Sequence, residues 1–167
     1  MDTKDCVKVV KEGKFVKKIC LQRFPFISQM KTPPSFKCFT EVTIRLETGA
    51  VTRFGKPKPQ RRRFDAVILV KPHYAAYGQE LFSIGIEIKS SKSDLVGDSK
   101  FRDYLGFANY FIFAVPDFLV SEAMKKSENE IGIGVLNVST GEFAKMPTYQ
   151  DVSIENSESI LRQIAFP

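Results

Sequence analysis

Apolar residues lie along the chain in short runs and in alternation with polar residues, and both patterns predict strands. Nearly continuous apolar runs of strand length, typical of strands buried on both faces, occur at 64–70 (FDAVILV), 110–116 (YFIFAVP) and 131–138 (IGIGVLNV). In residues 81–89 (LFSIGIEIK) the isoleucines alternate with other residues and therefore share one face. Residues 39–49 (FTEVTIRLETG) predict a further strand, and 141–146 (GEFAKM) are a candidate for a short one that pairs back through its glycine.

Helical periodicity is found between and after these runs. Phe101, Tyr104, Leu105 and Ala108 fall at the spacing of one apolar helix face, and Asp94 or Asp98 is a candidate cap for that helix. Residues 117–127 also predict a helix. A final helix is indicated by the spacing of Ile154, Ile160, Leu161 and Ile164.

The order of these elements predicts an α/β fold with a central mixed sheet of four to five strands flanked by helices. The link at 71–80 contains breakers and allows antiparallel pairing of the strands on either side of it. Residues 37–167 are expected to form a single globular domain. Residues 1–36 are expected to be an extension, for which a helix interrupted at Gly13 and a hairpin turning there both fit, the helix being favoured.

Composition limits the class of protein. The chain has 167 residues, of which 43% are hydrophobic, enough for one core without disulfides or metal. Neither an apolar run of membrane-spanning length nor a secretory signal is present, so we expect a soluble, cytoplasmic protein with no membrane partner. The three cysteines lack a C-x-x-C spacing and are expected to be free thiols.

The formal charge of +6 is concentrated in one segment, 53–63 (RFGKPKPQRRR), which contains no acid. Its prolines and glycine predict an irregular loop. Basic side chains displayed in this way are candidates for contacts to nucleic-acid phosphates, and they are Arg53, Lys56, Lys58, Arg61, Arg62 and Arg63. The alternative is a solvated run of charge that keeps the protein in solution.

Three ionisable residues occupy strand positions where burial would be costly, unless they share a task. Glu87 and Lys89 lie on the face of their strand opposite the isoleucines, and Asp65 lies near the start of the preceding strand. If the two strands pair, Asp65 comes beside the other two. Converging carboxylates favour a hard divalent cation, Mg²⁺ or Mn²⁺, and a neighbouring lysine would orient a water or stabilise charge on a phosphate.

This pattern resembles the PD-(D/E)xK nuclease superfamily, whose signature is an acid on one strand and Glu/Asp-x-Lys on the next. Further motifs make the chain similar to the MmcB-like DNA-repair family of that superfamily over roughly residues 38–140, and they are FTEV, RRFD, EIKSSKSD, GDSKFRDY and FAVP. The resemblance implies a restriction-endonuclease-like fold and a role in DNA repair. It makes Asp65, Glu87 and the carbonyl of Ile88 the metal ligands and Lys89 the catalytic lysine, with Glu41 as a further candidate that would act through water.

Other candidates have ordinary alternatives. Ser90 and Ser91 are possible phosphate contacts, but serines more often end a strand or begin a turn. Lys100 and Tyr104 lie one helical turn apart and are either phosphate contacts or surface residues. The aromatic residues of 107–113 are expected in the core rather than stacked on bases.

We therefore expect a metal-dependent DNA nuclease. One alternative is a catalytically silent DNA-binding module of the same fold, recruited to repair complexes; another is an unrelated α/β interaction domain. The choice between DNA and RNA, between endo- and exonuclease action, and between a monomer, a homodimer and a complex with repair proteins stays open.

Overall fold

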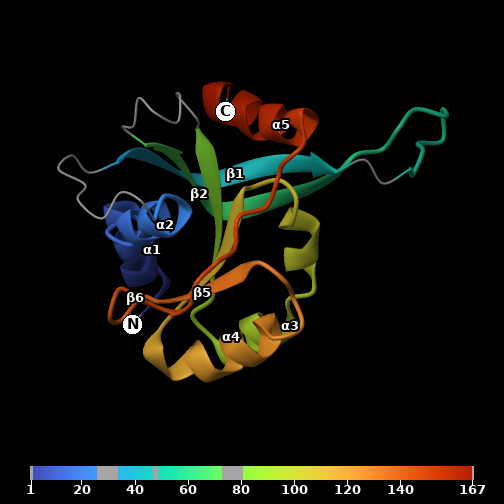
Figure 1. The fold of residues 1–167 in the computed structure, drawn as a ribbon. Coiled ribbons are helices and arrows are strands. Elements are labelled where there is room, and N and C mark those ends of the chain that lie inside the picture. Colours follow the sequence, from blue (N-terminus) through green and yellow to red (C-terminus); the bar gives the residue numbers. More distant parts are fainter. Residues whose placement is uncertain (1, 26–33, 47–48, 73–80, 167) are drawn as a thin grey trace.

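The computed structural model describes residues 2–25, 34–46, 49–72 and 81–166. Most of the predicted link at 71–80 therefore lies outside the described residues. The chain forms one mixed sheet with helices on both faces (Figure 1). Its elements, in chain order, are α1 (Thr3–Glu12), α2 (Val16–Arg23), β1 (Ser35–Leu46), β2 (Gln60–Lys71), β3 (Phe82–Ile88), α3 (Lys92–Gly97), the 3-10 helix η2 (Lys100–Tyr104), β4 (Tyr110–Val115), the 3-10 helix η3 (Asp117–Leu119), α4 (Val120–Ser127), β5 (Ile133–Asn137), β6 (Glu142–Lys145) and α5 (Ile154–Ala165).

The sheet has six strands in the order β1-β2-β3-β4-β5-β6, so the expected number of four to five is wrong. β1, β2 and β3 are antiparallel neighbours, β3, β4 and β5 are parallel, and β6 returns antiparallel to β5. The additional strand is β6, which has four residues with two of them exposed. Its weak apolar pattern made it only a candidate in the sequence, and the tight turn at Gly141 with φ 74° is what brings it back onto β5.

Each face of the sheet carries its own core. On one face, α1 and α2 cover the isoleucines of β3 through residues such as Cys6, Val10 and Ile19. On the other face, a second cluster joins Phe111 and Phe113 of β4 to side chains of α3, η2, α4 and α5. As expected, the aromatic residues of 107–113 are buried, and the three cysteines are free thiols that are buried or half-buried.

The first residues of the chain are helical, as the favoured alternative proposed. α1 begins with a capping box between Asp2 and Asp5 and ends at Gly13, whose φ of 60° is the left-handed conformation that glycine adopts easily. A side chain at Gly13 would also collide with the ring of Phe36. The break in the helical pattern thus turns the chain so that α2 packs beside α1 on the sheet (Figure 1).

Two elements differ from the predictions. Arg61, Arg62 and Arg63 belong to β2 rather than to a loop, because they pair with β1 in a continuous register that begins at Leu46↔Gln60. The expected helix through residues 101–108 is instead α3 followed by η2. α3 is capped by the hydroxyl of Ser91, and it ends at Asp98, whose backbone is extended.

Candidate active site

The strand pairing predicted for Asp65 and Glu87 is present. β2 and β3 are antiparallel with Ala66 opposite Ile86, and the next position in that register sets Asp65 opposite Glu87. At this end of the pairing a side chain joins the two strands in place of a backbone hydrogen bond. Oδ2 of Asp65 accepts a hydrogen bond of 2.7 Å from the backbone N–H of Ile88. The acid of one strand is therefore fastened to the Glu-x-Lys segment of the next.

Alternation along β3 separates apolar from ionisable side chains, as expected. Ile84, Ile86 and Ile88 belong to the core under α1 and α2. Glu87 and Lys89, on the opposite face, are only 4% and 6% exposed. Burying charged groups to this degree is costly unless each has partners.

Lys89 has three carboxylate partners, which we call the Lys89 cluster. Its Nζ lies 2.8 Å from Oδ2 of Asp98, 3.4 Å from Oε2 of Glu87 and 3.5 Å from Oδ1 of Asp94. Asp98 is the nearest partner and is itself held in place, since its Oδ1 accepts a hydrogen bond from the backbone N–H of Lys100. The segment that ends α3 and begins η2 thus covers the lysine.

Burial and like charge make the two strand carboxylates weak acids. Burial, followed by the charge of Asp65, raises the pKa of Glu87 to about 8, although Lys89 acts in the opposite direction. Burial likewise raises the pKa of Asp65 despite the hydrogen bond from Ile88. Near neutral pH the cluster therefore keeps a proton on Glu87.

Lys89 and Asp98 form an ion pair within the cluster, with Nζ and Oδ2 2.8 Å apart. Burial favours their neutral forms, but the hydrogen bond between them, their opposite charges and the further partners of each together outweigh it, so that the pKa of Lys89 is raised and the pKa of Asp98 is lowered. One strong ion pair thus lies beside a carboxyl group that is short of compensating charge.

Within the described residues, one carboxylate oxygen of Glu87 is free to bind a metal ion. Its Oε1 is buried and has no hydrogen-bond partner among the described residues. An orphaned carboxylate oxygen with a raised pKa, beside a second carboxylate, is a donor set suited to a hard cation. The described residues contain no group of three or more His, Cys, Asp or Glu side chains arranged to hold a metal ion, so any ion here would have to use the two carboxylates of Asp65 and Glu87 together with backbone oxygens or water.

Glu41 is not part of the Lys89 cluster. It lies on β1 between the registered pairs Thr40↔Ala66 and Val42↔Phe64, which sets its backbone opposite Asp65. Its φ of 59° is unusual for a residue other than glycine and interrupts the ladder there. Its exposed carboxylate lies 3.4 Å from Nη1 of Arg63.

The basic residues are spread along the hairpin of β1 and β2. Residues 49–59, which we call the hairpin tip, extend away from the sheet beyond the end of β1 (Figure 1). Nearer the sheet, Nε of Arg62 lies 2.7 Å from Oδ2 of Asp103, so that residue is tied to η2. Exposed cations continue outward from that point, and they are Arg61, Lys58, Lys56 and Arg53.

The four remaining candidates are placed differently from one another. Tyr104 is buried, and its hydroxyl donates to the carbonyl of Arg63. The hydroxyl of Ser91 caps α3, and Oγ of Ser90 lies 2.9 Å from Oγ1 of Thr3. Lys100 is exposed at the start of η2, next to the Lys89 cluster.

Asp94 and Asp98 were expected to be helix caps, and their contacts with Lys89 were missed. The signal in the sequence is that both follow the lysine within ten residues in the segment KSSKSDLVGD. The spacing of apolar residues predicts the start of a long helix in that segment, and a helix there gives no reason for Asp98 to lie over the end of β3. In the structure α3 is short and ends at Gly97, and the residue that follows it, Asp98, contacts Lys89.

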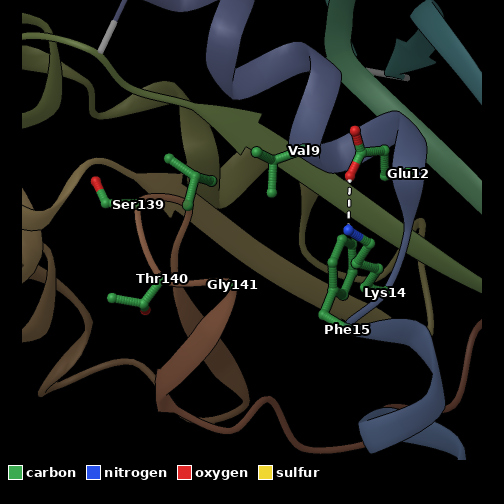
Figure 2. A pocket seen from close by; sticks show the side chains of 8 residues that line it. Val9, Glu12, Lys14, Phe15, Ser139, Thr140 and Gly141 are labelled. Atoms are coloured by element: carbon green, nitrogen blue, oxygen red, sulfur yellow. Dashed lines mark ion pairs between the residues drawn. The ribbon is translucent and has the colours of Figure 1, made fainter.

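A pocket on the other side of the sheet does not belong to this cluster. It lies between the end of α1 and the turn from β5 to β6, and Figure 2 shows Glu12 and Lys14 joined by an ion pair at its edge. Val9 and Phe15 form its apolar wall. None of Asp65, Glu87 and Lys89 lines it.

Comparisons with known proteins add little to this geometry. No family model matches the chain, and no curated protein matches it. A solved structure that is similar to the chain is a protein of unknown function from Silicibacter pomeroyi, with 19% identity and a TM-score of 0.48, covering 78% of this chain and 72% of that chain. In the described parts of the chain, no helix is both long and apolar enough to cross a membrane.

Proposed function

We propose that this protein is a metal-dependent nuclease that hydrolyses phosphodiester bonds in DNA and acts in DNA repair, with a restriction-endonuclease-like fold related to the MmcB-like family. The observation that carries the proposal is the convergence of Asp65, which lies within β2 and not at its start as expected, with Glu87 and Lys89 at the end of the antiparallel β3. An acid and a Glu-x-Lys triplet on adjacent strands are what the family resemblance implies.

The donors that would hold Mg²⁺ or Mn²⁺ are the carboxylates of Asp65 and Glu87 and the carbonyl of Ile88. When bound, the cation would neutralise negative charge that accumulates on the phosphate during hydrolysis. The orphaned Oε1 of Glu87 and the raised pKa of that side chain support this assignment. Glu87 must lose its proton before it can serve as a ligand.

Lys89 supplies the fixed positive charge of the site. Its ammonium group is held at the end of β3 by Glu87 and Asp98, and burial strengthens its interaction with any anion that approaches. Aimed at a scissile phosphate or at the attacking water, it would stabilise the charge that develops as the bond breaks. To do so it must exchange part of its contact with Asp98.

The test is hydrolysis of labelled single-stranded, duplex, flap and mismatched DNA with Mg²⁺ or Mn²⁺. Replacing the lysine with alanine (Lys89→Ala) should lower the rate by at least about 100-fold, the effect of losing one preorganised group that stabilises transition-state charge. Lys92→Ala is the matched control, because Lys92 is exposed and paired with Glu122. Its rate should stay within about twofold of wild type.

A second variant separates loss of chemistry from loss of folding. Glu87→Gln has the shape of the protonated side chain that the fold favours at neutral pH, so it should fold normally and still be inactive. Metal-independent hydrolysis, or full activity in either Lys89→Ala or Glu87→Gln, would contradict the nuclease assignment.

One observation favours a second candidate, a DNA-binding module of the same fold without turnover. Lys89 is already engaged at 2.8 Å by Asp98, a side chain that is itself only 8% exposed. A protein in which that pair never opens would bind DNA through the basic hairpin and leave it uncut. Salt-dependent DNA binding by the wild type with no hydrolysis under any metal condition would establish this alternative.

A further inference from the structure

The hairpin tip is an ordered turn. The backbone N–H of Thr52 donates to the carbonyl of Lys56 at 2.7 Å, and that of Gly55 donates to the carbonyl of Thr52 at 2.9 Å. Oγ1 of Thr52 also accepts from the N–H of Lys56. Below the turn, Val51 forms a bridge with Pro57. The side chains at the end of the hairpin are therefore presented in a defined arrangement.

The side chain at the end of this turn is an exposed aromatic ring. Phe54 is 74% exposed, and the guanidinium of Arg53 lies 4.7 Å from the centre of its ring. Single exposed apolar residues are common on protein surfaces. What sets Phe54 apart is its surroundings, because residues 50–64 contain six cations and no acid.

We infer that Phe54 stacks on an unpaired base of a nucleic acid strand while Arg53, Lys56 and Lys58 contact the flanking phosphates. This inference rests on the proposed function and specifies its substrate class: DNA with a single-stranded region, such as a flap, a frayed end or a displaced strand. An aromatic ring among cations matches both components of such a strand, since the base offers a flat apolar face and the backbone offers negative charge. Base pairs in an intact duplex are already stacked, and separating them costs energy.

The position of the hairpin tip relative to the Lys89 cluster sets the scale of the substrate. Phe54 and Asp65 are eleven positions apart in the sequence, and an extended chain of that length spans at most roughly 40 Å. That is the length of about a dozen nucleotides. Arg61 lies between the two on β2, is exposed and continues the positive track. A bond cut at the cluster should therefore lie within about a dozen nucleotides of the unpaired base.

The experiment measures binding in EDTA, so that no metal-dependent cutting occurs. Fluorescence anisotropy is recorded for a labelled oligothymidylate and a labelled duplex, each of about 20 nucleotides, with wild type, Phe54→Ala, Phe54→Trp and Phe118→Ala. Phe118 is the matched control, because it is 66% exposed and lies in η3 beside Asp117, away from the basic segment. None of these side chains is buried, so folding should be unaffected.

The expected result is selective. Phe54→Ala should weaken binding of the single strand by roughly fivefold to a hundredfold and change duplex binding by less than about twofold. Phe54→Trp should restore single-strand binding, and Phe118→Ala should have no effect. A 2-aminopurine placed in the single strand should lose fluorescence on binding to wild type but not to Phe54→Ala.

The inference is overturned if Phe54→Ala binds the single strand as well as wild type does, if it weakens single-strand and duplex binding equally, or if wild type binds neither. These outcomes are separate from the failure of the nuclease proposal. Hydrolysis that needs Lys89 but is accompanied by binding insensitive to Phe54 overturns the stacking role alone. Phe54-dependent binding without hydrolysis overturns the nuclease alone.

Discussion

The Lys89 cluster and the hairpin tip both contain cations, but they hold them under opposite conditions. In the cluster, one nearly buried ammonium group lies within 3.5 Å of three carboxylates. In the hairpin tip, the cations are exposed and their own segment contains no acid. A charge in the first position affects the folding free energy, since its partners would otherwise be buried alone. A charge in the second position mainly affects what the surface attracts.

The largest effect should come from removing the buried charge. Lys89→Met keeps the volume of the side chain but leaves Asp98 buried without its cation, and it should lower the free energy of unfolding by about 3–5 kcal/mol. Urea denaturation at neutral pH measures this change. The exposed counterpart, Lys92→Met, should cost less than about 1 kcal/mol. The double variant Lys89→Met/Asp98→Asn should recover part of the loss, since it removes the stranded carboxylate.

Equal destabilisation by Lys89→Met and Lys92→Met would contradict the claim that the buried charge of Lys89 matters more for folding than an exposed charge. It would mean that the contact between Lys89 and Asp98 is no stronger than a surface ion pair.

The next effect should appear in the pH dependence of stability, and it is smaller for each pH unit. Burial raises the pKa of Glu87 from its ordinary value of 4.5 to about 8, so between these values the folded chain should hold a proton that the unfolded chain has lost. Stability should therefore fall as pH rises from about 5 to 8, by no more than about 1.4 kcal/mol per pH unit for this group. The raised pKa of Asp65 acts in the same direction at the acidic end.

Glu87→Gln should flatten this slope and be more stable than wild type at pH 8, as measured by urea denaturation across the range. The ion pair adds no slope there. Asp98 has a lowered pKa, so its contribution is lost only below its unfolded value of 3.8, and Lys89 has a raised pKa, so its contribution is lost only above 10.5. Glu122→Gln is the control, because that half-buried acid, paired with Lys92, has a lowered pKa and titrates below this window. An unchanged slope in Glu87→Gln would show that Glu87 is ionised throughout.

The smallest effect on stability, and a clear one on binding, should come from the hairpin tip. Lys56→Ala should leave the urea midpoint almost unchanged, because Lys56 is exposed and the turn uses its backbone groups. If its ammonium group neutralises one phosphate, the slope of log affinity against log salt should become shallower by about 0.9. DNA titrations at several salt concentrations measure this slope. An unchanged slope would remove Lys56 from the phosphate contacts.

Local sequence patterns were sufficient to predict most strands of the sheet and the positions of Asp65, Glu87 and Lys89. Alternation of period two placed Glu87 and Lys89 together, opposite the isoleucines, because successive side chains of any strand point to opposite faces. Pairing of β2 with β3 followed from two adjacent strand patterns and a link compatible with a hairpin. Asp65 then had to lie beside Glu87.

Patterns were insufficient where a contact depends on a change in chain direction. The helical spacing of Phe101, Tyr104 and Leu105 is real, since Phe101 and Tyr104 are buried, but a 3-10 turn presents them just as well as an α-helix. The arginines of β2 have no strong intrinsic preference for strands, so the sequence predicted a loop there. They belong to the sheet because their backbone pairs with β1.

The α/β character, the face on which each residue of β3 lies and the acid-free run of cations could all be predicted before folding was known, since all three depend on residue type and local spacing. Folding in three dimensions was needed to make Asp98 the closest partner of Lys89, to raise the pKa of Glu87 by burial, and to leave Phe54 exposed at the end of the hairpin. These features depend on which distant segments pack together and how much water they exclude, and no local pattern encodes that.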